Sequence, residues 1–144
     1  MIRTSIIAAA VTAAFAMTAL PATAGGITIE QWGWGNAAGG NQTGWQNKIG
    51  VFQNGRFNEM VSQQFGNRNT VAVGQEGRRN SVDTWQNGNR NAAGVGQFGD
   101  NHNAVITQDG NGNITAGVQV GNNCDANIVQ NGNGNVAAFV QTCP

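Results

Sequence analysis

Residues that usually carry out catalysis are scarce in this chain of 144 residues. The sequence holds one histidine, His102, and two cysteines, Cys124 and Cys143. It shows no Ser/His/Asp arrangement, no paired carboxylates at a recurring site and no phosphate-binding loop. One histidine does not make a metal site. We therefore expect no enzyme activity, no metal and no other cofactor.

The side chains whose type and spacing stand out are amides. The pattern Gln, any, Gly, any, any, Asn recurs every 11 residues without insertion or deletion, as in QNGRFN and QEGRRN. A carboxamide donates and accepts hydrogen bonds, so the chemistry on offer is hydrogen bonding. Biased composition alone does not keep such a register, which indicates a physical repeat. A disordered, prion-like tract, the alternative that the Gly-rich and Asn-rich composition raises, has no reason to keep it.

Three sets of residues define the repeat. The glutamines are Gln31, Gln42, Gln53, Gln64, Gln75, Gln86, Gln97, Gln108, Gln119 and Gln130. The asparagines are Asn36, Asn47, Asn58, Asn69, Asn80, Asn91, Asn113 and Asn135. The glycines are Gly33, Gly44, Gly55, Gly66, Gly77, Gly88, Gly99, Gly110, Gly121 and Gly132. His102 and Cys124 stand at the two remaining Asn positions, and for His102 we expect a substitute for the amide, not a base.

The residues between each Asn and the next Gln predict a β-strand. Apolar residues sit two apart there, as in Val71 and Val73, which places them on one face of a strand. By the same count Asn47 and Gln53 point the same way as the core residues between them. A right-handed coiled coil also repeats every 11 residues, but Gly and Asn in every unit argue against a helix. Each unit is then a strand of about seven residues and a turn of about four centred on the Gly.

Two arrangements of such units are open, an antiparallel meander and a coiled stack. Identical turns with inward amides at both strand ends favour the stack. We predict an all-β fold, a β-solenoid of 22-residue coils with two short strands per coil, each parallel to and in register with the strand 22 residues earlier. Identical amides stacked at the strand spacing of about 4.8 Å would satisfy one another, which removes the cost of burying them.

Residues 1–24 are predicted to be a secretion signal. Arg3 supplies the positive start, an apolar Ala-rich run follows, and Ala22 and Ala24 form the small-residue cleavage site. A membrane anchor is the weaker reading, because Pro21 and this site end the apolar run. We expect residues 25–144 to form one repeat domain, without a membrane span, that passes through the periplasm to the cell exterior.

The unit QxGxxNxΦxΦxQ resembles the curlin repeat over Glu30 to Gln141. The resemblance implies a β-solenoid subunit of curli fibres, a functional amyloid of the biofilm matrix that serves adhesion and surface colonisation. The partners it implies are further copies of the chain, a nucleating subunit and outer-membrane export machinery. It leaves open whether the chain is a major or a minor subunit. The alternative function is a monomeric secreted binding module for ice, glycan or another surface.

Three further features bear on that choice. The spacing of Cys124 and Cys143 places them near one corner on adjacent coils, which predicts a disulfide, with free thiols or intermolecular pairing as alternatives. Arginines cluster in the turns, where we expect solvated side chains and no specific nucleic-acid site, although short basic ladders could meet acidic polysaccharide. Aromatic residues at outward positions would serve bundling or adhesion, or be scattered surface residues. These aromatic residues are Trp32, Phe52, Phe65, Trp85 and Phe98.

Overall fold

The computed structural model describes residues 25–144, and the predicted secretion signal lies outside the described residues. This part of the chain forms eleven β-strands and no helix. The strands are β1 (Ile27–Trp34), β2 (Ala37–Thr43), β3 (Lys48–Arg56), β4 (Glu59–Asn67), β5 (Thr70–Arg78), β6 (Ser81–Asn89), β7 (Ala92–Asp100), β8 (Asn103–Asp109), β9 (Ile114–Asn122), β10 (Asp125–Asn131) and β11 (Val136–Cys143).

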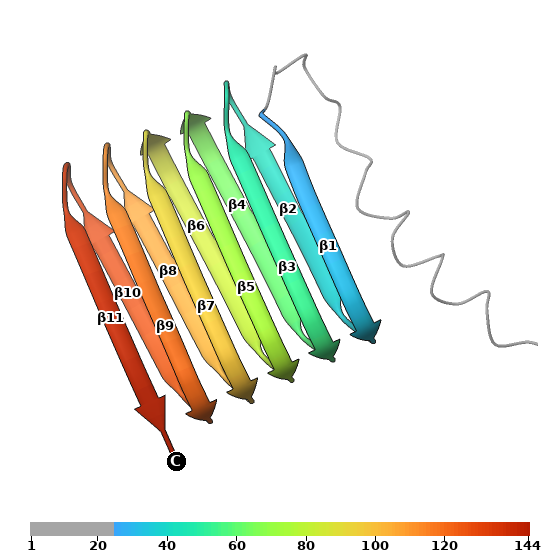
Figure 1. The fold of residues 1–144 in the computed structure, drawn as a ribbon. Helices are drawn as coiled ribbons and strands as arrows, with labels where there is room; N and C mark the ends of the chain where they lie inside the picture. Colours follow the sequence, from blue (N-terminus) through green and yellow to red (C-terminus); the bar gives the residue numbers. More distant parts are fainter. Residues whose placement is uncertain (1–24) are drawn as a thin grey trace, which may run out of the picture.

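The strands form two facing parallel sheets. The odd-numbered strands make a six-stranded sheet in the order β1-β3-β5-β7-β9-β11, and the even-numbered strands make a five-stranded sheet from β2 to β10. Figure 1 shows the two layers, with the strands of one running opposite to those of the other. Successive strands therefore alternate between the sheets, and each coil holds two of them. The predicted β-solenoid is confirmed, and the antiparallel meander is excluded.

Within each sheet the register offset is one 22-residue coil throughout. Gln53 lies beside Gln75, and Gly55 lies beside Gly77. The same offset relates Gln64 to Gln86 in the other sheet. A slip by one residue would turn the buried face outward, so the amides and the core residues fix the register together.

The core is thin and largely polar. Alternate residues of each strand are buried, as in β3, where Ile49, Val51 and Gln53 face inward. The apolar cluster consists mainly of small residues, and no buried residue of it is aromatic. Ser62 and Thr84 are also buried, and the hydroxyl of Thr84 donates to that of Ser62 at 2.8 Å. Hydrogen bonds must therefore contribute much of the specificity that a larger apolar core would supply.

The corners differ from the expected turn centred on glycine. Most strands continue through the glycine, so that β3 extends to Arg56 and includes Gly55. A second residue with positive φ lies two positions later, directly before the Asn. That residue is Gly at only three corners; at the others it is Gln46, Phe57, Arg68, Arg79, Arg90, Asn101 or Asn123, with φ between 55° and 59°. Each corner therefore has positive φ at two positions, and only the first of them is always glycine.

Candidate functional site: the amide ladders

The glutamines form two continuous columns of hydrogen bonds along the solenoid. In the six-stranded sheet each Gln Nε2 donates to the Oε1 of the Gln one coil later, at 2.6 to 3.0 Å. In the five-stranded sheet the bonds from Gln64 onward measure 2.8 Å. The columns contain Gln31, Gln53, Gln75, Gln97, Gln119 and Gln141, and Gln42, Gln64, Gln86, Gln108 and Gln130. Each coil is thereby tied to the next.

Each glutamine of the columns from Gln53 onward also joins the two sheets. The Nε2 of Gln75 donates to the backbone carbonyl of Glu59 in β4 at 2.9 Å. The Nε2 of Gln86 donates to the carbonyl of Thr70 in β5 at 3.1 Å. The carbonyl that accepts is always 16 residues earlier, in the facing sheet. Both hydrogens of the amide are therefore used, one along the stack and one across it, which the sequence pattern did not reveal.

The corner asparagines from Asn36 to Asn113 each make three side-chain hydrogen bonds. The Oδ1 of Asn69 accepts from the backbone N–H of Asn91 one coil later at 3.0 Å. Its Nδ2 donates to the carbonyl of Gly88 in the next coil at 2.9 Å and to that of Phe65 in its own corner at 3.2 Å. Most of the other asparagines repeat the set. Among residues 25–144 no buried side-chain nitrogen or oxygen lacks a partner.

The glycines lie where two coils touch backbone to backbone. Their φ values run from 104° to 135°, a region that residues with a Cβ rarely adopt. A Cβ on Gly77 would also collide with the carbonyl oxygen of Gly99 in the next coil. That oxygen accepts from the Nδ2 of Asn80 at 2.8 Å. Glycine and asparagine thus occur together because the close approach of two backbones brings the carbonyl within reach of the amide.

This geometry agrees with a known repeat. The model of the curlin-associated repeat matches residues 77–110, which run from the corner glycine Gly77 to the corner glycine Gly110, a distance of one and a half coils. These residues contain the curlin-associated repeat. No curated protein matches the chain. The resemblance that the sequence pattern indicated is therefore confirmed by the family match.

His102 takes over the asparagine's role in this curlin-repeat solenoid. Its backbone N–H donates to Asn80 Oδ1 at 3.0 Å, and its Nδ1 accepts from the backbone N–H of Cys124 at 3.2 Å. Because Nδ1 accepts, the proton lies on Nε2, which donates to the carbonyl of Phe98 at 3.2 Å. The ring is buried and fully used, so it has no group left for acid–base chemistry.

We expect His102→Asn to leave stability nearly unchanged, because asparagine makes the same bonds at the neighbouring corners. His102→Leu should lower the free energy of unfolding by about 2 to 4 kcal/mol, since it leaves the Cys124 N–H and the Phe98 carbonyl without partners. Urea denaturation of both variants checks this. Equal losses in both would show that the imidazole has a role of its own.

Cys124 and Cys143 form a disulfide with a Cα–Cα distance of 5.6 Å. They are 19 residues apart, the same step that separates each corner Asn from the glycine carbonyl it bonds. Cys124 stands at an Asn position and Cys143 beside Gly121, at a Gly position. The covalent bond therefore replaces the amide-to-carbonyl hydrogen bond at the last corner and ties β11 to the coil before it.

Loss of this bond should loosen β11 selectively. We expect Cys124→Ser with Cys143→Ser to reduce stability by about 3 kcal/mol, the chain-entropy value for a loop of this length. The variant with Cys124→Asn and Cys143→Gly restores the repeat pattern and should recover about 1 kcal/mol through the hydrogen bond. Hydrogen exchange of the β11 amides measures both. Faster exchange spread evenly over all strands would contradict a local role.

The charged and aromatic side chains lie on the outside. Arg78 donates from Nη2 to Asp100 at 2.6 Å one coil later, and this hydrogen bond lowers the pKa of the Asp100 carboxyl below its ordinary value. Trp32, Phe52, Trp85 and Phe98 are exposed, whereas Phe65 is half-buried against Trp85 with ring centres 4.9 Å apart. Side chains one coil apart are therefore also paired on the surface, as Arg78 and Asp100 are.

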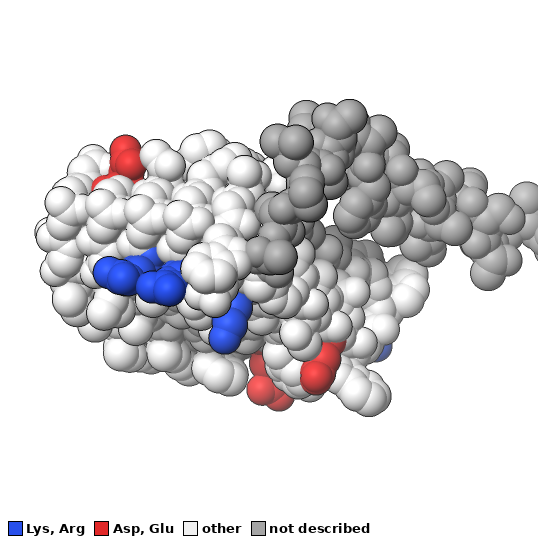
Figure 2. Space-filling model, turned by 90° about the horizontal axis from the view of Figure 1, so that it is seen from above, with Lys and Arg blue, Asp and Glu red and all other residues white. Residues whose placement is uncertain are grey.

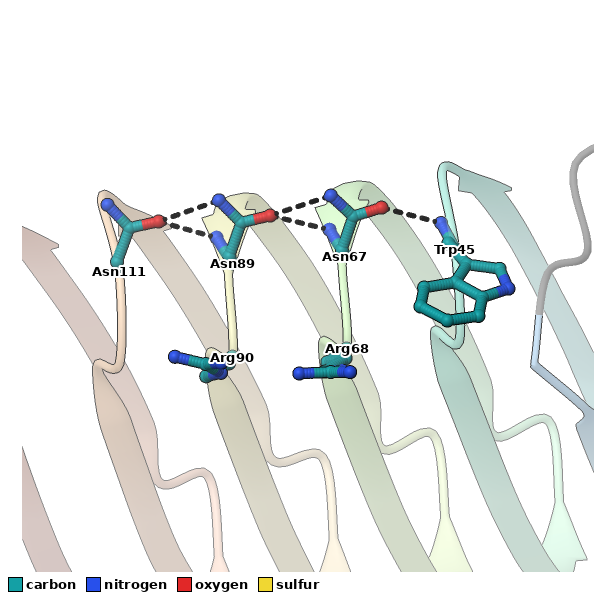
Figure 3. Close-up of a pocket in the computed structure, with 6 residues that line it drawn as sticks. All are labelled: Trp45, Asn67, Arg68, Asn89, Arg90 and Asn111. Carbon is teal, nitrogen blue, oxygen red and sulfur yellow. Dashed lines mark hydrogen bonds between the residues drawn. The ribbon is translucent and has the colours of Figure 1, made fainter.

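A basic hollow lies over the corners that follow the even-numbered strands. The guanidinium groups of Arg68 and Arg90 lie one coil apart below a ladder of exposed asparagines, and Arg68 lies 5.7 Å from the ring centre of Trp45 (Figure 3). Figure 2 shows basic side chains next to one another on this face. Arg68 Nε also donates to Gln46 Oε1 at 3.0 Å. This hydrogen bond ties Arg68 to the coil before it, which gives the side chain a structural role.

Residues 25–144 contain no group of three or more His, Cys, Asp or Glu side chains placed to hold a metal ion. In the same range no helix has the length and apolar character needed to cross a membrane. The features that organise this solenoid are its ladders.

Proposed function

We propose that this curlin-repeat protein is a secreted structural subunit that stacks end to end into extracellular amyloid fibres of a biofilm matrix, where it serves adhesion and surface colonisation. The observation that carries the proposal is the reach of the ladders. The Gln columns extend from β1 and β2 to β10 and β11, and the edges of these end strands have no partner strand among residues 25–144. Open strand edges favour the addition of another chain.

The direction of the hydrogen bonds supports head-to-tail addition. From Gln53 onward each ladder bond runs from the Nε2 of one Gln to the Oε1 of the Gln one coil later, toward the C-terminal end. Among the described residues the side chain of Gln141 accepts from Gln119 and donates to the carbonyl of Asp125, which leaves the second hydrogen of its Nε2 free. At the other end the Oε1 of Gln31 has no donor within the described chain. A second copy in the same orientation brings donor to acceptor, whereas a reversed copy opposes donor to donor.

The partners of such a subunit are further copies, with a nucleating subunit and outer-membrane export machinery as the expected assistants. The match to the curlin-associated repeat supports these assignments. The low formal charge of the chain, a net charge of zero, also limits repulsion between identical copies.

Assembly of the purified secreted protein tests the proposal. We expect fibres that bind thioflavin and diffract with a meridional reflection near about 4.7 Å, the strand spacing of cross-β structure. A protein that stays monomeric at high concentration over days would contradict it and favour a monomeric binding module. Seeds made by sonicating the fibres should shorten the lag phase, which separates templated growth from amorphous aggregation.

A further inference from the structure

The two ends of the solenoid do not match by simple translation. β1 and β11 both belong to the six-stranded sheet, and the five-stranded sheet begins at β2 and ends at β10. Each strand stacks on the strand two places earlier in the chain. A strand that followed β11 would therefore stack on β10. The described part therefore holds five and a half coils.

We propose that successive subunits are related by a half-turn about the long axis, so that β1 of the second copy pairs with β10 and its β2 pairs with β11. This inference rests on the proposed function and takes β1 and β11 as the end strands of the subunit. The six-stranded sheet of one copy then continues into the five-stranded sheet of the next, and the solenoid passes the joint without a gap.

Translation alone would leave a gap. It would stack β1 of the second copy directly on β11. In the other sheet, one strand position would then stay empty between β10 and β2 of the second copy. The edge of β10, from Asp125 to Asn131, would then face no strand. Each unpaired backbone group removed from water carries a penalty, so seven residues of open edge disfavour that joint strongly.

The side chains fit the half-turn joint. It places Gln130 against Gln31 of the second copy, and Gln141 against its Gln42, so both columns continue. Within the subunit the backbone N–H of Asn135 donates to the Oδ1 of Asn113, one coil earlier, at 3.0 Å. The half-turn joint lets the backbone N–H of the second copy's Asn36 donate to the Oδ1 of Asn135 in the same way. Both kinds of ladder cross the joint in register.

The apolar residues at the ends fit as well. Ile27 and Ile29 lie beside the buried Ile49 and Val51 in the core-facing register, yet they are 46% and 41% exposed. In the half-turn joint they would cover Ala126 and Ile128 of β10 in the neighbouring copy.

Phe139 supplies a second fit. Its ring fills the space where a Cβ on Gly117 would lie. The half-turn brings Gly40 of the second copy to its other side, so a large side chain is matched by a glycine both below and above. Translation would instead oppose Phe139 to Ile29.

Cross-linking distinguishes the two joints. Val129 and Val140 are outward residues of β10 and β11, 60% and 77% exposed. The half-turn brings Glu30 of the next copy beside Val129, and translation brings it beside Val140. Neighbouring strands lie about 4.8 Å apart, within the Cα range of a disulfide.

Fibres grown from an equal mixture of Glu30→Cys and Val129→Cys proteins should give disulfide-linked dimers on mild oxidation. The matched mixture of Glu30→Cys with Val140→Cys should give several-fold fewer. Equal yields, or more dimer with Val140→Cys, would overturn the half-turn joint while leaving the fibre proposal intact. Failure of the unsubstituted protein to form fibres would overturn both.

Helical reconstruction of the unsubstituted fibres gives an independent measurement. At about 4.8 Å per coil, the half-turn joint predicts a subunit rise of about 26 Å with a rotation near about 180°. Translation predicts about 29 Å with a rotation near zero. A fibre with the second pair of values would overturn the proposal.

Discussion

Replacing Gly88 by alanine should lower the free energy of unfolding by several kcal/mol, on the order of 4. Gly88 has a φ of 116°, and a Cβ there would meet the carbonyl oxygen of Gly110 in the next coil. Neither coil can move away without breaking ladder bonds. The carbonyl of Gly88 accepts from Asn69 Nδ2, and that of Gly110 accepts from Asn91 Nδ2. Backbone strain and two loosened buried hydrogen bonds therefore add together.

Gly74→Ala is the matched control. Gly74 lies in β5, where a Cβ would meet no heavy atom within 4 Å, and its backbone is not in the left-handed region. Alanine there should be neutral or slightly stabilising, because it restricts the unfolded chain. Urea denaturation of the two variants, with fibre yield as a second readout, gives the comparison. Similar behaviour of Gly88→Ala and Gly74→Ala would contradict the backbone contact between coils.

The architecture could be predicted from the sequence because two periods act together. A period of two places Asn47, Ile49, Val51 and Gln53 on one face, and all four are buried. A period of 11 without insertion then favours one register, since a slip of one residue exposes the amides and a slip of two places them beside core residues. The side-chain types were sufficient here because they themselves make the contacts between coils.

The corners could not be predicted to the same depth. The left-handed residue before each Asn is Arg at three corners and Phe at another, so no residue type marks the position. Its conformation is imposed by the Asn, whose amide binds carbonyls on both sides of the corner. The bond from each Gln to the facing sheet was also missed, because it depends on the distance between the sheets, which no spacing along one strand encodes.

Gln86→Leu should be as damaging as the glycine substitution, although it removes only hydrogen bonds. Leucine has nearly the volume of glutamine, so packing changes little. It removes the partner of one Nε2 hydrogen of Gln64 and of the Oε1 of Gln108, and it removes the side-chain donor to the Thr70 carbonyl. Each such group costs about 1 to 3 kcal/mol, so we expect a loss on the order of 3 to 6 kcal/mol. Thermal unfolding and fibre growth measure it.

Gln63→Leu serves as the control, because Gln63 points outward from β4 and should tolerate the change. A double-substitution cycle then separates a ladder from unrelated buried amides. Gln64→Leu and Gln86→Leu each break the bond that joins the two residues, at 2.8 Å, so the double variant loses that bond only once. Its cost should fall short of the sum of the single costs by about 1 to 3 kcal/mol. Strict additivity would mean that each amide is satisfied separately, and the column would then not act as a continuous ladder able to extend from one subunit to the next.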